Sequence, residues 1–287
     1  MTSVKKWWKR DPFNESAVIA YSAIFSLPGL LVVVVTVAGY FFGADAVSGK
    51  LHQQIAEAMG PDTADSVKEM IKAANKSKDS WWATVIGIIV IFIGATGVFA
   101  QLQKELNNIW EVKATTKKSG IVVYLKTRLF SFGLILSIAF LLLISLVISS
   151  LLSALGNWIM GLNESLLILF KALNFMISLG IITLLFALMF KILPDAKIKW
   201  NTVWIGAFCT ALLFTIGKSA LGLYFGKADP GSGYGAAGSI ILILLWVSYS
   251  SMIVLFGAEF TKAYSDLYGE AAPTENAVKK SDQNTRT

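Results

Sequence analysis

Histidine and cysteine are almost absent from this chain of 287 residues, which contains one of each. The single cysteine, Cys209, excludes an internal disulfide and a cluster of cysteine ligands for a metal. Metal-dependent hydrolysis needs several histidine or carboxylate ligands that converge on one site, and most carboxylates here fall in predicted loops. We therefore expect no enzymatic activity, no metal and no cofactor, and the composition argues against a membrane-bound nuclease.

Charge is scarce as well, since 15% of the residues are charged and 55% are hydrophobic, whereas about 25% are charged in globular proteins. Six long apolar stretches hold most of the hydrophobic residues, at 17–42, 81–100, 129–155, 165–190, 200–226 and 236–258. Each can cross a hydrocarbon core about 30 Å thick as a helix of about 20 residues. They lack the strict alternation of barrel strands. The sequence therefore predicts an all-α, polytopic membrane protein with six transmembrane helices.

The spans divide the chain into three parts. Residues 1–16 form an N-terminal segment, residues 17–262 form the transmembrane domain with an outer loop at 43–80, and residues 263–287 form a tail. The first apolar stretch is too long for the hydrophobic region of a signal peptide, so we expect it to be retained. From Pro273 onward the tail is polar and lacks aromatic residues, which favours disorder.

Lysine and arginine set the expected orientation. Six spans place both termini on one side, and most of the 25 lysines and arginines fall on that side. Cytoplasmic loops of membrane proteins carry this excess, so we expect a multi-pass protein of the bacterial inner membrane with cytoplasmic N- and C-termini. The net charge of +7 would then face anionic membrane lipids, and no nucleic-acid partner is expected.

The predicted loops contain two amphipathic patterns. In the first outer loop, apolar residues recur at helical spacing on both sides of Pro61, which predicts a short amphipathic helical hairpin, either a structural cap or a gate or partner site. The residues are Val47, Leu51, Ile55, Met59, Val67, Met70 and Ile71. After the second span, Leu102, Leu106, Ile109 and Trp110 form one face of a helix that we expect to run along the cytoplasmic interface.

Polar residues at membrane depth are costly, so they are functional candidates. Near the cytoplasmic ends of the spans, the candidates are Glu105, Asn107, Asn108, Arg128 and Glu259, with Glu15 at the same depth. In the outer half, they are Lys171, Asn174 and Lys218. Solvation at the headgroups and snorkelling of long side chains are the structural alternatives.

The glycine-rich run before the last span supplies the candidates Tyr234, Gly235 and Gly238. A tight turn followed by close helix packing is the simplest interpretation, and a backbone-lined polar cavity is the alternative. Gly222 and Gly226 predict a close contact between the fifth and sixth spans. Gly217-Lys218-Ser219 matches the end of a phosphate-binding loop, but Leu212 occupies the position of the required first glycine, so nucleotide binding is excluded.

Four motifs in order resemble the YihY/BrkB family over about residues 10–265. They are the runs at 97–110 (GVFAQLQKELNNIW), 193–200 (LPDAKIKW), 234–239 (YGAAGS) and 255–260 (LFGAEF). The resemblance implies a six-helix bacterial inner-membrane protein; some members are linked to virulence or serum resistance. Members of the family were once mislabelled ribonuclease BN. Relatives have also been suggested to move envelope lipids or lipopolysaccharide precursors. The resemblance implies no catalytic residues.

Two functional hypotheses follow. In the first, the protein is a transporter, or a translocator of an anionic lipid or envelope precursor, that has no nucleotide site and depends on an ion gradient or a partner ATPase for uphill transport. Glu105, Asn107, Asn108 and Glu259 would line a cytoplasmic vestibule, Lys171 and Lys218 would attract the anion, and Gly235 and Gly238 would allow helix movement. In the second, the protein is a structural or scaffold protein of the envelope.

Overall fold

The computed structural model describes residues 3–75, 96–114, 164–228, 230–268, 272–273 and 277–279. Within these ranges, four helices are long and apolar enough to cross a membrane. They are α2 (Pro12–Phe42), α7 (Glu164–Ile192), α8 (Trp200–Ala228) and α9 (Gly238–Tyr268). They match the first and the last three predicted spans. The third predicted span and most of the second lie outside the described residues, so the six-span topology stays a prediction.

Short elements complete the described fold. Helix α1 (Ser3–Lys9) precedes α2, and a 3₁₀ helix, η1 (Ser232–Ala237), precedes α9. Strand β1 (Val112–Ala114) pairs antiparallel with β4 (Ala277–Lys279), and β2 (Ala196–Lys197) pairs antiparallel with β3 (Ala272–Pro273). Helix α9 continues past the predicted end of the last span, and β3 and β4 lie within the tail for which we predict disorder.

Local signals explain where the first helices begin and end. Asp11 caps α2, its side chain accepting the Asn14 N–H at 3.4 Å, and Pro12 occupies the first turn, where no intrahelical N–H bond is lost. Gly43 and Gly60 have φ angles of 86° and 91°, which glycine adopts without a Cβ penalty. These two glycines divide the segment into α2, α3 (Ala44–Met59) and α4 (Pro61–Asn75).

Helices α3 and α4 form the helical hairpin predicted from the sequence. Its apolar face packs on α2 and α9 in a cluster of buried residues comprising Leu31, Val32, Val35, Ala38, Val47, Val67, Ile71 and Ile243. The Ser66 hydroxyl of α4 also donates to the Ser239 hydroxyl in the first turn of α9 at 3.0 Å. The hairpin is therefore built onto one end of the bundle.

The helix at residues 96–109 has the apolar face that the sequence predicts. The predicted position of this helix, along the cytoplasmic interface, is wrong. Leu106 and Ile109 are fully buried, and Leu102 and Trp110 nearly so. They belong to the main hydrophobic cluster together with residues of α2, α7, α8 and α9. The helix thus packs inside the bundle, because burying this face against other helices removes more of its surface than lying at the interface.

Helices α8 and α9 approach most closely at two glycines that face threonines. A Cβ added to Gly206 would lie 1.9 Å from Thr261 Oγ1, and a Cβ added to Gly257 would lie 1.9 Å from Thr210 Oγ1. Among the described residues, the contact predicted at Gly222 and Gly226 is absent: Gly222 approaches the Glu57 backbone of α3, and none of these residues lies within 4 Å of the Gly226 position. The prediction failed because small residues permit close packing without showing where the helices meet.

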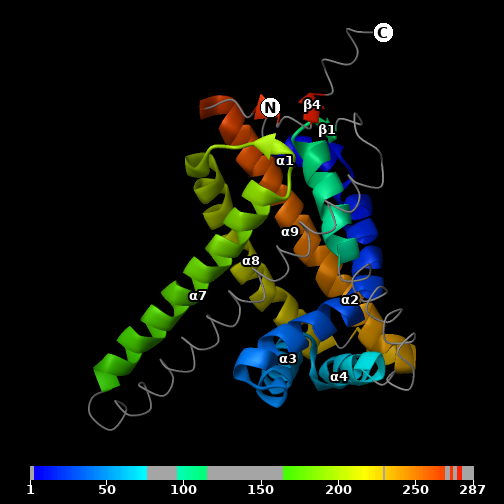
Figure 1. Cartoon of the computed structure of the whole chain (residues 1–287). Coiled ribbons are helices and arrows are strands. Elements are labelled where there is room, and N and C mark those ends of the chain that lie inside the picture. Colours follow the sequence, from blue (N-terminus) through cyan, green and yellow to red (C-terminus); the bar gives the residue numbers. More distant parts are fainter. Residues whose placement is uncertain are drawn as a thin grey trace.

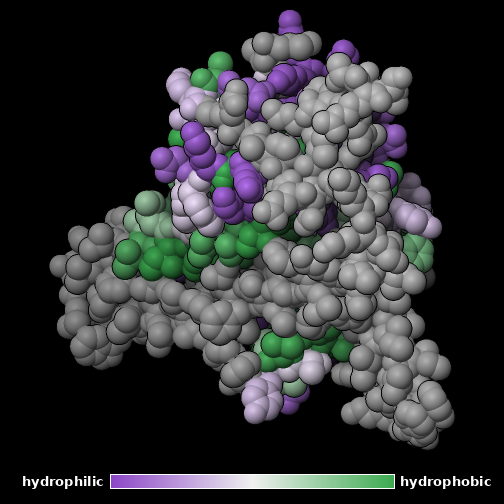
Figure 2. Space-filling view, turned by 45° about the horizontal axis from the view of Figure 1, so that its top comes forward, coloured by the Kyte–Doolittle hydropathy of each residue, from purple (hydrophilic) through white to green (hydrophobic). Residues whose placement is uncertain are grey.

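The described residues give the bundle two distinct ends. Helix α1, β1, β4 and the last turns of α9 lie at one end, here the terminal end, and α3 and α4 lie at the other, the hairpin end (Figure 1). Hydrophilic residues gather at the terminal end, and a band of hydrophobic residues follows below them (Figure 2). This order is the one expected of a membrane protein.

Candidate functional site

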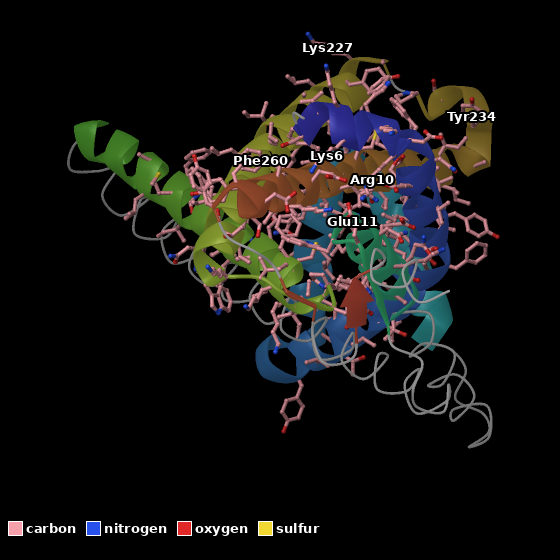
Figure 3. The ribbon with its side chains drawn as sticks, turned by 90° about the horizontal axis from the view of Figure 1, so that it is seen from above. Lys6, Arg10, Glu111, Lys227, Tyr234 and Phe260 are labelled. Carbon is pink, nitrogen blue, oxygen red and sulfur yellow. The ribbon has the colours of Figure 1, made fainter. Side chains whose placement is uncertain are left out.

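Arg10 joins three segments at the terminal end. It lies between α1 and α2, and its guanidinium forms an ion pair with Glu259 of α9. The same side chain donates to the carbonyl oxygens of Asn108 at 3.0 Å and Ile109 at 3.5 Å. These carbonyls lie in the last turn of the helix at 96–109, where carbonyl groups run out of intrahelical donors, and the Asn108 oxygen also accepts the Glu111 N–H at 3.2 Å. In the view from above, Arg10, Lys6 and Glu111 lie toward the middle, whereas Lys227 and Tyr234 lie at the edge (Figure 3).

Glu259 is the most deeply buried charged residue in the described part of the chain, with 1% of its surface exposed. It lies in α9, in which no charged residue precedes it. A carboxylate buried in a membrane-spanning helix is expensive unless it is paired. Arg10, whose side chain is 25% exposed, supplies the pairing charge and remains accessible from the terminal end.

Two further carboxylates lie close to this ion pair. Glu105 is nearly buried and accepts from neutral amides, from Gln101 at 2.7 Å and from Asn108 at 3.1 Å. Glu15 of α2 is half-buried and interacts electrostatically with Arg10, Glu105 and Glu259. Three carboxylates from three helices therefore surround one guanidinium.

Lys262 and Glu111 form a second ion pair next to the first, with Lys262 Nζ and Glu111 Oε1 2.6 Å apart. Lys262 follows Glu259 by one helical turn and is buried. The hydrogen bond from Lys262 lowers the pKa of the Glu111 carboxyl from its ordinary value of 4.5. Glu111 has a φ of 55°, a left-handed conformation that ends the helix and usually favours glycine. We call Arg10, Glu15, Glu105, Glu111, Glu259 and Lys262 the charge cluster.

Asn107 does not enter the charge cluster. Its amide nitrogen donates to Asp195 Oδ2 at 2.8 Å, and its side-chain oxygen accepts the Asp195 backbone N–H at 2.8 Å. This two-way bond fixes the helix at 96–109 to the loop that follows α7. A role in holding two helices together explains Asn107 without a substrate.

Of the candidates predicted for the outer half of the spans, the structure describes the side chains of Asn174 and Lys218. Lys218 is exposed on α8. Asn174 of α7 is half-buried, and its side-chain oxygen has no hydrogen-bond partner among the described residues. Arg128 and the side chain of Lys171 lie outside the described residues.

The glycine-rich run forms the tight turn predicted from the sequence. Gly235 has φ 53° and ψ −129°, a combination open essentially to glycine alone. A Cβ at Gly238 would lie 2.5 Å from the Gly231 carbonyl oxygen, so the start of α9 also requires glycine. Tyr234 is exposed and lies far from the charge cluster.

Glu15, Glu105, Asn108 and Glu259, which the sequence predicts at one depth, lie together in the structure. Their partners Arg10, Glu111 and Lys262 are not among the predicted site residues. A signal was present for Lys262, which is three residues after Glu259 and so on the same helix face. Glu105 and Glu259 are buried in this conformation, and the vestibule that we predict around them stays a prediction. Among the described residues, no group of histidine, cysteine and carboxylate side chains is placed to hold a metal ion.

Comparisons with known proteins agree with the motif-based resemblance. The family model described as "Virulence factor BrkB" matches residues 3–282. A UPF0761 membrane protein of Haemophilus influenzae is 26% identical over 91% of this chain and 94% of its own length. A UPF0761 membrane protein of Alteromonas mediterranea is 27% identical over 95% of this chain and 89% of its own. No solved structure matches the chain.

Proposed function

Because the chain belongs to the virulence factor BrkB family, whose relatives above are named membrane proteins, we propose that it moves an anionic lipid or envelope precursor across the bacterial inner membrane. Both termini would be cytoplasmic, so that the charge cluster lies at the cytoplasmic end of the bundle. The protein would act as a transporter and not as an enzyme.

The buried ion pair between Arg10 and Glu259 is the observation that carries this proposal. Replacing a buried ion pair by apolar residues often stabilises a protein, so stability alone does not account for it. Charged groups inside membrane helices mark substrate or ion pathways in many transporters. The pair also joins α9 to the N-terminal segment, and Arg10 bonds the helix at 96–109. Breaking the pair would therefore allow these helices to move relative to one another.

Arg10 is the residue best suited to receive the anionic group. A guanidinium presents five N–H donors and binds phosphate or carboxylate in a bidentate manner. In this structure Nε pairs with Glu259, and Nη2 donates to two carbonyl oxygens. Under the proposal, an anionic headgroup replaces Glu259 on Arg10, and the released carboxylate takes up a proton or turns to Lys262, its neighbour on α9.

The test is lipid movement in vesicles that contain the purified full-length chain. A fluorescent anionic phospholipid is placed in both leaflets, and a membrane-impermeant reductant bleaches the label that reaches the outside. We expect the wild type to expose the inner-leaflet label to bleaching, Arg10→Gln to prevent this, and Arg10→Lys to retain part of it. Lys227→Gln, at an exposed cation of the hairpin end, serves as the matched control and should act as wild type.

If wild-type vesicles bleach no faster than protein-free vesicles with each anionic lipid tried, the translocator proposal is wrong. A scaffold protein of the envelope then becomes the better account. For a scaffold, deleting residues 46–75, most of the α3–α4 hairpin, should abolish the cellular phenotype, whereas Lys218→Ala and Glu259→Gln should leave it intact. If the protein is a translocator, the single substitution Glu259→Gln should disturb the cellular phenotype.

A further inference from the structure

Helix α1 has two faces of different character. Ser3, Lys6, Trp7 and Arg10 are half-buried, and Val4, Lys5, Trp8 and Lys9 are exposed. This alternation has the period of an α-helix. The inner face is explained by its contacts: the Trp7 ring meets Phe256 of α9 edge-on at 5.7 Å, and Lys6 pairs with Asp266 at 3.3 Å. The outer face has no such explanation.

The outer face combines an apolar stripe with a basic one. Val4 and Trp8 are one helical turn apart and are 55% and 64% exposed, and the Trp8 ring meets the exposed ring of Phe13 at 6.0 Å. Lys5 and Lys9, also one turn apart, flank this stripe. A surface tryptophan, phenylalanine and valine in a row are costly in water. The same residues are favourable where headgroups meet acyl chains.

The position of α1 in the chain restricts what can cover this face. Only Arg10 and Asp11 separate α1 from Pro12, where the membrane-spanning helix α2 begins. The inner-face contacts hold α1 against α9, itself a membrane-spanning helix. The outer face therefore lies within a few residues of the membrane boundary, at the depth of the lipid headgroups.

We infer that the outer face of α1 is a binding surface for anionic phospholipids, with Trp8 seated among the headgroups and Lys5 and Lys9 paired with their phosphates. Charge complementarity selects anionic over zwitterionic lipid, because a lysine near a bilayer surface gains attraction from excess negative charge. Arg10 directly follows Lys9, so lipids bound to the outer face would also stabilise the ion pair between Arg10 and Glu259 on the inner face. The lipid surface does not depend on the translocator proposal.

The experiment uses the fluorescence of Trp8 in proteoliposomes. The full-length chain is placed in vesicles of phosphatidylcholine and phosphatidylglycerol, with bromine atoms near the headgroup on one lipid or the other. Bromine quenches nearby tryptophans, and subtracting the signal of Trp8→Phe isolates Trp8 from the other tryptophans. We expect quenching of Trp8 by both lipids, and stronger quenching when the bromine is on phosphatidylglycerol.

Lys5→Ala/Lys9→Ala should remove the preference for phosphatidylglycerol while leaving Trp8 quenched. Each lysine contributes about a fivefold factor near an anionic surface, so the preference should fall by up to about 25-fold. The matched control is Lys50→Ala/Lys227→Ala, which removes two exposed lysines of the hairpin end. This variant should keep the preference for phosphatidylglycerol. The inference is overturned if neither lipid quenches Trp8, or if the double variant keeps the preference of the wild type.

Discussion

The two ends of this bundle are held together by different chemistry. At the terminal end, two ion pairs that each include a buried charged residue bridge separate elements, Arg10 with Glu259 and Lys262 with Glu111. At the hairpin end, the Lys72–Glu69 pair lies within α4, and the His52–Asp65 pair at 2.9 Å joins α3 to α4, with both partners outside the core. The contact of the hairpin with α2 and α9 is apolar, with a neutral hydrogen bond from Ser66 to Ser239.

The difference shows which end has to do more than fold. The hairpin end uses apolar burial and neutral hydrogen bonds, which stabilise a contact without removing charge from water. The terminal end buries charge, which costs several kcal/mol per ion before pairing offsets it. Apolar packing could hold the terminal end together at lower cost. We therefore expect the buried charges to serve the function of the protein.

Arg10→Ala should produce the largest loss of stability, because it removes the charge that pairs directly with the buried Glu259 carboxylate. Breaking a buried ion pair costs about 3–5 kcal/mol. Thermal unfolding of the purified chain in detergent micelles measures the effect.

The double variant Arg10→Gln/Glu259→Gln is the control for this prediction. It removes both charges and should recover most of the stability lost in Arg10→Ala. A double variant as unstable as Arg10→Ala would mean that packing of the arginine stem, and not the ion pair, stabilises the terminal end.

Gly257→Ala should give the next largest effect. The added methyl group would lie 1.9 Å from Thr210 Oγ1, and that hydroxyl is fixed by donating to the Gly206 carbonyl at 2.7 Å. Overpacking of this kind costs about 1–3 kcal/mol. The melting temperature in detergent should fall accordingly.

Gly226→Ala is the matched control near the hairpin end of the same helix pair. Nothing lies within 4 Å of its added methyl group, and alanine in a helix is favoured over glycine by about 0.5–1 kcal/mol. A small gain in stability is therefore expected. Equal losses in both variants would show that the close contact of α8 and α9 extends along the whole pair.

Features set by local sequence could be predicted. Length and hydropathy identified the four described spans, and apolar spacing around Pro61 identified the hairpin of α3 and α4. Periodicity also identified the apolar face of the helix at 96–109. It could not show that this face is covered by other helices, because an interfacial helix and a packed helix have the same pattern. The glycines at which α8 meets α9 depend on how the two helices cross, which no local pattern records.

The depth of the candidate site residues could be predicted from the sequence, but their ion-pair partners could not. Burial cost singled out Glu105 and Glu259, and counting along the spans placed them at one level. Arg10 was grouped with the basic residues of the N-terminal segment, because an arginine before a first span is commonly an orientation signal. Pairing it with Glu259 requires knowing that α1 folds back onto α9, a contact between the two ends of the sequence.

Glu111→Gln should have a smaller, pH-dependent effect. The hydrogen bond from Lys262 lowers the pKa of Glu111, so its stabilising contribution is complete above the ordinary value of 4.5 and is lost as the pH falls through the lowered pKa. The side chain of Glu111 is 62% exposed, and solvent screening limits the effect to about 1 kcal/mol or less. Wild type and variant should differ in melting temperature at pH 7 and converge in acid. If the difference in melting temperature persisted in acid, its cause would be the left-handed backbone at position 111 and not the charge of Glu111.

Lys72→Gln at the hairpin end should change stability least. Lys72 and Glu69 lie 2.7 Å apart, but their side chains are 58% and 69% exposed, so water already solvates both charges. Pairs of this kind on a helix contribute about 0.2–0.5 kcal/mol and are weakened by salt. The small shift in melting temperature should disappear at high ionic strength, whereas the loss in Arg10→Ala should persist, because the Glu259 carboxylate is buried and a partly buried pair is screened much less than an exposed one. A Lys72→Gln loss as large and as salt-resistant as that of Arg10→Ala would mean that the two ends of the bundle do not differ in the way proposed.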